Sequence, residues 1–328
     1  MASLAAVQPA LANPPELQLP IACTPGKDCF VQNYPDDAPA NVSGQDFACG
    51  AATYHGHDGT DIRVLSIAAA RGVQVLAAAP GVVRGARDGV ADHLMRNEAD
   101  KAAVKGRECG NGVAITHADG WETQYCHMHL GSIRVKAGQK VEAGTVLGEV
   151  GQSGETQFAH VHLTVRHGRQ AFDPFTGKAI AADSTGTSCH ANATNASLWA
   201  PEVRALLGNP ATEVIETGFA ELPPTLDGLE EGHAGLPVPT PSSPAVLLFT
   251  RIMHLRVGDR VHAKLISPSV PALEQTSEPS ARNNAVQFYF WGRKRGAAVW
   301  PPGSYRGHVE VLRAGAVVAS GDAMLTLP

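Results

Sequence analysis

The sequence predicts a mainly β protein of 328 residues with two folded domains. Apolar residues make up 44% of the chain, a globular value, and aromatic residues only 5%. Glycine (34) and proline (23) are frequent, which favours short strands joined by turns over long helices. Several segments also alternate apolar and polar residues, among them HVHLTVRHG and AVQFYFWGRK, as strands with one buried face do.

Five segments are expected along the chain. Residues 1–16 are a signal remnant or a disordered end, and residues 17–49 a turn-rich extension tied by disulfides. Residues 50–208 hold strand after strand and form the first domain. The Pro/Gly-rich stretch 209–245 is expected to be a linker or loop, and residues 246–328 an Ig-like β-sandwich.

Two short helices are expected within this β framework. Residues 88–109 are polar and rich in helix formers, and they interrupt a hairpin, which indicates an inserted loop with a short helix. Residues 197–208 also read as helical, because Pro201 suits a first turn and Gly208 suits a helix end.

Charge and hydropathy limit the classes of function. The net charge is −5, which argues against nucleic-acid binding. No stretch approaches the roughly 20 apolar residues that span a membrane, so no transmembrane segment is expected. The start, MASLAAVQPALANPP, contains an Ala-Leu-Ala cleavage-like triplet. It is either the tail of a secretory signal or a disordered alanine-rich end.

The cysteines indicate an oxidising compartment. There are six, an even number without a CxxC pair: Cys23, Cys29, Cys49, Cys109, Cys126 and Cys189. Cys109 and Cys126 flank a hairpin-like segment, GNGVAITHADGWETQY, and can face each other across its strands. We therefore predict a Cys109–Cys126 disulfide and a periplasmic or secreted protein. The alternative is a cytosolic enzyme with six buried free thiols.

Five residues carry the candidate chemistry. His57 and Asp61 are four residues apart in a glycine-containing segment and can converge on one ion. His160 and His162 stand at i and i+2 of a predicted strand, so both imidazoles project from one face. His127 ends another predicted strand.

This set suits a hydrolytic zinc ion. Such an ion takes three ligands from His and carboxylate side chains and keeps one open position for water. Zinc lowers the pKa of that water to about 7, and a neighbouring imidazole can take its proton or stabilise an oxyanion. The spacing alone does not say which of His127, His160 and His162 is the ligand.

The order HDGTD, YCHM and HVH resembles peptidase family M23, the lysostaphin/LytM-like endopeptidases. The resemblance covers roughly residues 50–175 and includes GVQVLAAAPGVV, CGNGVAITH and GSIRVKAGQKVEAGTVLGEVGQSG. It implies a two-layer antiparallel β fold with a central groove, acting on stem or cross-link peptides of bacterial peptidoglycan. Which peptidoglycan bond is cut stays open, although a glycine bridge is disfavoured because no SH3-like wall-targeting domain is recognisable.

The resemblance also implies a role for each site residue. His57, Asp61 and His162 would bind one Zn²⁺ per chain. His160 would be the general base that activates the zinc water, and His127 would stabilise the tetrahedral intermediate. The chain is expected to act as a monomer.

Two features depart from the family pattern. His129 creates a second HxH motif with His127 and is a surface or rim residue, a substrate contact or a decoy, with the surface favoured. The insertion 88–109 exceeds what the core fold needs and is expected to wall one end of the groove.

Three other interpretations of the sequence are less well supported. IRVKAGQKVEAGTVLGEVG resembles a lipoyl-type half-barrel but lacks the modified-lysine motif, so only the β geometry is shared. A non-catalytic M23-like activator or wall-binding module is disfavoured because the ligand set is complete. An adhesion or carbohydrate-binding role would rest on the C-terminal aromatics, for which a core role is favoured. These are Phe288, Tyr289, Phe290, Trp291 and Trp300.

Overall fold

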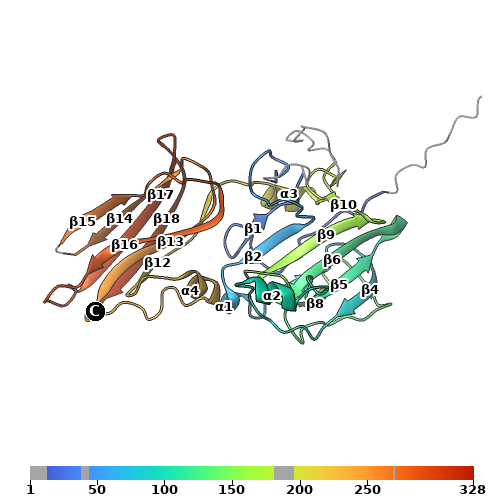
Figure 1. Cartoon of the computed structure of the whole chain (residues 1–328), viewed down its shortest axis with the longest axis horizontal. Helices are drawn as coiled ribbons and strands as arrows, with labels where there is room; N and C mark the ends of the chain where they lie inside the picture. Colours follow the sequence, from blue (N-terminus) through green and yellow to red (C-terminus); the bar gives the residue numbers. More distant parts are fainter. Residues whose placement is uncertain (1–12, 38–43, 181–195, 269) are drawn as a thin grey trace, which may run out of the picture.

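The computed structural model describes four stretches of the chain, residues 13–37, 44–180, 196–268 and 270–328 (Figure 1). The expected leader remnant falls mostly outside these stretches, as does Cys189, so the leader stays a prediction. Strands dominate the described residues, which confirms the mainly β class. Within them, no helix combines the length and apolar character that crossing a membrane requires.

Nine strands form one antiparallel sheet in the N-terminal half. They are β1 (Cys29–Asn33), β2 (Thr60–Val64), β4 (Gly81–Arg87), β5 (Asn111–Thr116), β6 (Trp121–Met128), β7 (Lys140–Val141), β9 (His160–His167), β10 (Gln170–Asp173) and β11 (Lys178–Ala179). The main order is β1-β2-β9-β6-β5-β4-β7, with β10 paired to β9 and β11 to β10. Strands β2, β9 and β6 are therefore neighbours near the middle of the sheet.

A second, small sheet packs on the first. It consists of β3 (Gln74–Leu76) and β8 (Val146–Glu149). Val75 of β3 and Leu147 of β8 are fully buried in one core cluster with Val113 and Tyr125 of the large sheet. This is the two-layer antiparallel arrangement that the sequence predicted, and burial of these apolar faces stabilises it.

The segment 17–49 contains a disulfide, Cys23–Cys29, as expected, but it also contributes a strand to the large sheet. Its strand β1 pairs with β2 and all five of its residues are buried. Leu17 and Ile21 are fully buried in the same core. The turn-rich flanks dominate the composition of this segment, so its five-residue strand CFVQN was missed. Strand β1 completes the sheet beside the strand that carries Asp61.

Four short helices occur in the described residues: α1 (Ile67–Ala70), α2 (Glu98–Ala103), α3 (Pro201–Leu207) and α4 (Leu226–Glu231). Helix α2 confirms the helix expected in the insertion, and it begins with a capping box between Asn97 and Asp100. Helix α3 confirms the second one, with Pro201 in its first turn and Gly208 as its C-cap.

Seven strands form a β-sandwich in the C-terminal half (Figure 1). One sheet has the order β12-β13-β16 and consists of β12 (Glu213–Ala220), β13 (Ala245–Leu255) and β16 (Asn284–Lys294). The other has the order β15-β14-β17-β18 and consists of β15 (Val270–Thr276), β14 (Arg260–Ser267), β17 (Gly303–Arg313) and β18 (Ala316–Leu327). Both sheets supply one apolar core, as in aligned sandwiches. The sandwich is thus observed, while its Ig-like subtype stays a prediction.

The expected linker 209–245 is only partly a loop. Strand β12 lies inside it and pairs with β13 over almost its full length, so the sandwich begins near residue 213. Helix α4 lies inside it as well, capped by the side chain of Thr225. The Pro/Gly-rich composition of residues 221–245 concealed the strand-forming segment EVIETGFA that precedes it.

The C-terminal aromatic residues mostly pack inward. Trp300 is buried and donates its indole N–H to the carbonyl of Ser243, 2.9 Å away. Tyr289 and Trp291 stack at 5.6 Å and pack against the sandwich core. Phe290 is exposed at 41%. A core role thus accounts for these aromatics better than an aromatic binding face.

A buried ion network joins the two halves. The Nη2 atom of Arg63 lies 2.8 Å from Oε2 of Glu230, and Nη1 of Arg251 lies 3.2 Å from Oε1 of the same carboxylate. All three side chains are almost fully buried. Arg251 also donates to the carbonyl of Leu65. Because isolated buried charges are unstable, these partners fix the sandwich and helix α4 against strand β2.

Asp173 is a buried carboxyl at the end of β10. It accepts hydrogen bonds from the amide of Phe175 (2.8 Å) and the hydroxyl of Thr176 (2.9 Å). Burial nevertheless raises its pKa to about 7, and the negative charges of Asp37 and Asp46 act in the same direction. The folded protein therefore favours the protonated carboxyl.

A raised folded-state pKa makes stability depend on pH. The folded state keeps a proton that the unfolded chain releases above its pKa of about 4, so the free energy of unfolding falls as pH rises from 4 to 7. We expect Asp173→Asn to remove this slope and to stabilise the protein above pH 7 by up to a few kcal/mol, since each pKa unit is worth about 1.4 kcal/mol. Urea unfolding of both proteins at pH 4 to 8 measures the difference; parallel profiles would contradict the assignment.

Candidate active site

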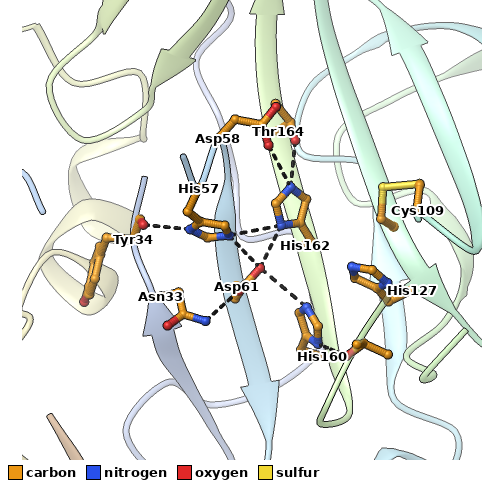
Figure 2. A network of polar contacts seen from close by, with 12 residues as sticks. Asn33, Tyr34, His57, Asp58, Asp61, Cys109, His127, His160, His162 and Thr164 are labelled. Atoms are coloured by element: carbon orange, nitrogen blue, oxygen red, sulfur yellow. Dashed lines mark hydrogen bonds and ion pairs between the residues drawn. A yellow bond between two sulfur atoms is a disulfide. The ribbon is translucent and has the colours of Figure 1, made fainter. Parts of the chain in front are cut away.

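Five side chains predicted from the sequence meet on three neighbouring strands (Figure 2). Asp61 lies on β2, with His57 in the loop before it, and His160 and His162 lie on β9. His127 lies near the end of β6. Asp61 pairs with His162 in the β2–β9 register, and His162 pairs with Cys126 in the β6–β9 register. The register therefore brings residues about 100 positions apart into one site.

The carboxylate of Asp61 is the centre of the cluster. Its Oδ1 atom lies 2.7 Å from Nδ1 of His162, 3.2 Å from Nε2 of His57 and 3.4 Å from Nε2 of His160. One ligand atom from each of His57, Asp61 and His162 lies within 4.8 Å of the other two. Asp61 and His57 are buried at 3% and 2% exposure. These three residues form a possible metal site.

Strand β1 and the residue that follows it, which the sequence did not link to the site, orient two of these residues. The carbonyl of Tyr34 lies 2.8 Å from Nδ1 of His57, and the side-chain amide of Asn33 donates to Oδ2 of Asp61 at 2.8 Å. The Tyr34 carbonyl can only accept, so Nδ1 of His57 donates to it and Nε2 is the nitrogen that faces Asp61. Such outer contacts are typical of metal ligands.

His162 has a different orientation. Its Nδ1 faces Asp61, while its Nε2 lies 2.8 Å from the hydroxyl of Thr164 and 3.5 Å from Asp58. Burial opposes a charge on this ring, but the hydrogen bonds to Asp58 and Asp61 outweigh burial and raise its pKa to about 9. The pKa of Asp61 lies well below its usual value: burial opposes ionisation, and the surrounding imidazoles outweigh it. The pocket thus favours positive charge next to a buried carboxylate.

His127 is held in a strained backbone conformation. Its φ is 62°, a left-handed value that non-glycine residues rarely adopt. Its amide donates to the carbonyl of Cys109 at 2.8 Å, and its Nδ1 lies 2.8 Å from the carbonyl of Ser153. Burial holds the pKa of His127 well below its ordinary value, with further lowering from His160 and His162. The ring is therefore neutral and faces the cluster with Nε2 as an acceptor.

The disulfide predicted next to His127 is present. Cys109 and Cys126 are bonded, and Cys23 is bonded to Cys29. No free cysteine occurs in the described residues. Cys126 immediately precedes His127, so the bond holds the strained end of β6 against the start of β5.

His160 rests on residues that the sequence did not indicate. Its ring stacks on Phe158 with centroids 4.3 Å apart, and its Nδ1 lies 2.9 Å from the carbonyl of Phe158 and 3.1 Å from the hydroxyl of Thr156. The guanidinium of Arg63 lies over the Phe158 ring, with its Cζ atom 5.1 Å from the ring centroid. No motif marks these residues, because their contact with His160 depends on the fold of the 151–159 turn.

A groove passes across the cluster. One pocket of about 380 Å³ contains His127, His160 and His162, and its walls include Met95 and Lys101 from the insertion. A second pocket of about 430 Å³ shares His127 and His162 and continues past Asp58 and Arg166. The insertion 88–109 therefore contributes a wall of the groove, as the sequence predicted.

His129 lies outside the cluster. Its Nδ1 is 2.7 Å from Oδ2 of Asp92, and its side chain is 54% exposed. Asp92 also accepts from the amides of Leu130 and Gln152, both at 2.9 Å. His129 thus pairs with the insertion at the protein surface, which agrees with the favoured surface interpretation.

The profile of peptidase family M23 matches residues 55–174, and this part of the chain belongs to that family. The cell division protein DipM of Caulobacter vibrioides is 43% identical over 58 residues, which cover 18% of this chain but only 9% of that protein.

Solved structures of M23 proteins also match. The catalytic domain of a mutant of the prophage-encoded M23 protein EnpA from Enterococcus faecalis is 26% identical, covers 40% of this chain and 79% of that one, and has a TM-score of 0.26. The catalytic domain of the antimicrobial peptidase lysostaphin from Staphylococcus simulans is 21% identical in sequence. The match covers 37% of this chain and 77% of the lysostaphin chain, with a TM-score of 0.26.

Removing the Cys109–Cys126 disulfide by a double Cys→Ser substitution is expected to cost about 3 kcal/mol of unfolding free energy, from the loop-closure entropy of a 17-residue separation. Hydrogen exchange of the His127 amide should also rise well above that of neighbouring β6 amides, because its acceptor lies on Cys109. The matched control, removal of Cys23–Cys29, closes only six residues and should cost about 2 kcal/mol without changing exchange at His127. Unchanged His127 exchange in the first variant would contradict the proposed restraint.

Proposed function

We propose that this protein is an exported zinc endopeptidase that hydrolyses stem or cross-link peptides of bacterial peptidoglycan. The observation that supports this most is the single buried carboxylate, Asp61, contacted by His57, His160 and His162. Peptidase membership follows from the family match over residues 55–174. The metal, the substrate and the residue roles are our proposal.

The donor set suits zinc. His57, Asp61 and His162 offer two imidazole nitrogens and one carboxylate oxygen, which is a common catalytic zinc set with one position left open. Hard cations such as Ca²⁺ and Mg²⁺ prefer oxygen ligands, so two imidazoles argue against them. Zinc supplies Lewis acidity and lowers the pKa of water. In this proposal His57 binds through Nε2, and His162 through Nδ1.

His160 is assigned as the general base. The Phe158 carbonyl accepts from its Nδ1, which leaves the Nε2 lone pair directed to the cluster. Asp61 lies 3.4 Å from this Nε2 and stabilises the imidazolium that forms when the ring accepts a proton from the attacking water. The stacked Phe158 restricts rotation of the ring and keeps Nε2 in place.

His127 is assigned to the tetrahedral intermediate. Its ring lies 4.6 Å from that of His160, centroid to centroid, across the groove. Ser153 fixes the Nδ1 proton, so Nε2 donates only after it gains a proton of its own. The negative charge of the intermediate favours uptake of a proton from solvent at Nε2, and the protonated ring would then donate a hydrogen bond to the oxyanion.

The disulfides support the proposed location, and the relatives support the proposed substrate class. Disulfides at Cys23–Cys29 and Cys109–Cys126 support an oxidising environment such as the periplasm or the cell exterior. The named relatives are a cell division protein and an antimicrobial peptidase, which support a cell-wall substrate. A non-catalytic activator is less well supported, because all five residues of the site converge.

Substitutions at the four histidines should separate the roles. His57→Ala and His162→Ala are expected to lose both zinc and activity. His160→Ala should keep about one zinc per chain and lose roughly 10²–10⁴-fold in kcat, the usual contribution of a general base. The control His129→Ala should keep both, since His129 lies at the surface. Zinc content by elemental mass spectrometry and fragments released from purified sacculi measure the two properties.

Two results would refute the assignment. Full zinc and full activity in His57→Ala would exclude that residue as a ligand. Equal zinc loss in His160→Ala and His162→Ala would mean that both imidazoles bind the metal. The masses of the released fragments also identify the bond that is cut.

A further inference from the structure

The groove continues from the catalytic cluster into the space between the two halves of the chain. The pocket that contains His160 is also lined by Gln157, Phe158 and Ala285, and Ala285 belongs to strand β16 of the sandwich. The same three residues line an adjoining cavity of about 500 Å³. We call this cavity the interdomain cleft. Its far wall consists of residues 282–286, Leu226 and Glu230, all outside the M23 match.

The walls of the interdomain cleft are held in place by buried contacts. Glu230 lines the cleft and is fixed by Arg63 and Arg251 from the two halves. Gln32 on β1 also lines the cleft, and its carbonyl lies 2.9 Å from Nε2 of His254 on β13. A space bounded by such fixed partners is preformed, so a ligand would not have to order it on binding.

The cleft carries positive charge that its own residues do not neutralise. Its lining includes Arg63, Arg96 and Arg282 against a single acid, Glu230. Arg63 pairs with Glu230, and Arg96 pairs with Asp227. Arg282 is exposed and donates from Nε to the side-chain oxygen of Asn284. In the parts of the chain that the structure describes, Arg282 forms no ion pair.

The opposite end of the groove has the reverse charge. The pocket beyond His162 is lined by three acids, Asp58, Glu108 and Glu155, of which Asp58 pairs with Arg166 and Glu155 with Lys101. A peptide that crosses the cluster therefore meets acidic side chains on one side and guanidinium groups on the other. Such a field orients a substrate that bears both ammonium and carboxylate groups.

We propose that the interdomain cleft binds a carboxylate of the peptide substrate through Arg282, which makes the C-terminal sandwich a part of the substrate-binding site. This proposal rests on the proposed endopeptidase function and specifies its substrate as an anionic peptide. Guanidinium groups bind carboxylates through paired, charge-assisted hydrogen bonds. The side-chain amides of Gln32 and Gln157, which line the same cleft, can pair with the peptide backbone.

A matched pair of probes tests the proposal: a dye-labelled cross-linked muropeptide dimer, and the same dimer after its carboxylates are converted to carboxamides. Binding is measured by fluorescence anisotropy with the full chain carrying His160→Ala, so that no turnover interferes. We expect amidation to weaken binding about tenfold, the effect of one charge-assisted interaction. Adding Arg282→Glu or Arg282→Gln should abolish the difference between the two dimers, chiefly by weakening binding of the acid form.

Arg306→Glu is the matched control, because it makes the same charge change at an exposed position of strand β17 outside the cleft. It should keep the tenfold preference, and circular dichroism should show that each variant is folded. Retention of the preference in both Arg282 variants, or its absence in the parent protein, overturns the proposal.

Hydrolysis of the unmodified dimer by the wild-type chain is scored separately. Hydrolysis without a carboxylate preference would refute the cleft and leave the endopeptidase function standing. An Arg282-dependent preference without hydrolysis would support the cleft and refute the function.

Discussion

The carboxylate of Asp61, buried among three imidazole rings, is the interaction on which the site depends. A carboxylate at 3% exposure is unstable without compensating positive charge or hydrogen bonds. Here His57, His160 and His162 surround one oxygen, and Asn33 donates to the other. Removing any one of these partners leaves the carboxylate charge less compensated. The contacts that prepare the site for a cation therefore also connect the site to the surrounding strands.

The large sheet supplies the rigidity that this arrangement needs. Asp61 and His162 are paired residues on adjacent strands, so their separation is set by backbone hydrogen bonds rather than by flexible loops. Strand β1 adds Asn33 and the Tyr34 carbonyl from one side. The strained backbone of His127 is held from the other side by the disulfide at Cys126 and by the carbonyl of Cys109.

Buried contacts tie the second half of the chain to the half that contains the site, and an ion network centred on Glu230 is one of them. Glu230 bridges Arg63 and Arg251, and Arg63 also lies over Phe158, on which His160 stacks. A continuous chain of contacts thus runs from the sandwich to the assigned base. Two members of this network, Arg63 and Glu230, also line the interdomain cleft, so the same contacts connect the sandwich to the shape of the groove.

The sequence by itself predicted the mainly β class, the five residues of the site and the Cys109–Cys126 bond. These follow from local patterns: alternation, an HxH pair on one strand face, and cysteines at the ends of one hairpin. The register that brings Asp61 to His162, 101 positions away, was not readable from spacing. The family resemblance, rather than spacing, supplied the expectation that these residues converge.

Only the tertiary structure showed that strands β1 and β12 belong to sheets, and that Arg63, Glu230 and Arg251 join the two halves. Composition conceals a five-residue strand between turns, because strand formation there depends on a partner strand far along the chain. Buried ion pairs leave no local pattern either, since their partners come from β2, α4 and β13. Local residue patterns thus identified the five candidate residues, whereas long-range strand register brought them together and long-range packing formed the groove around them.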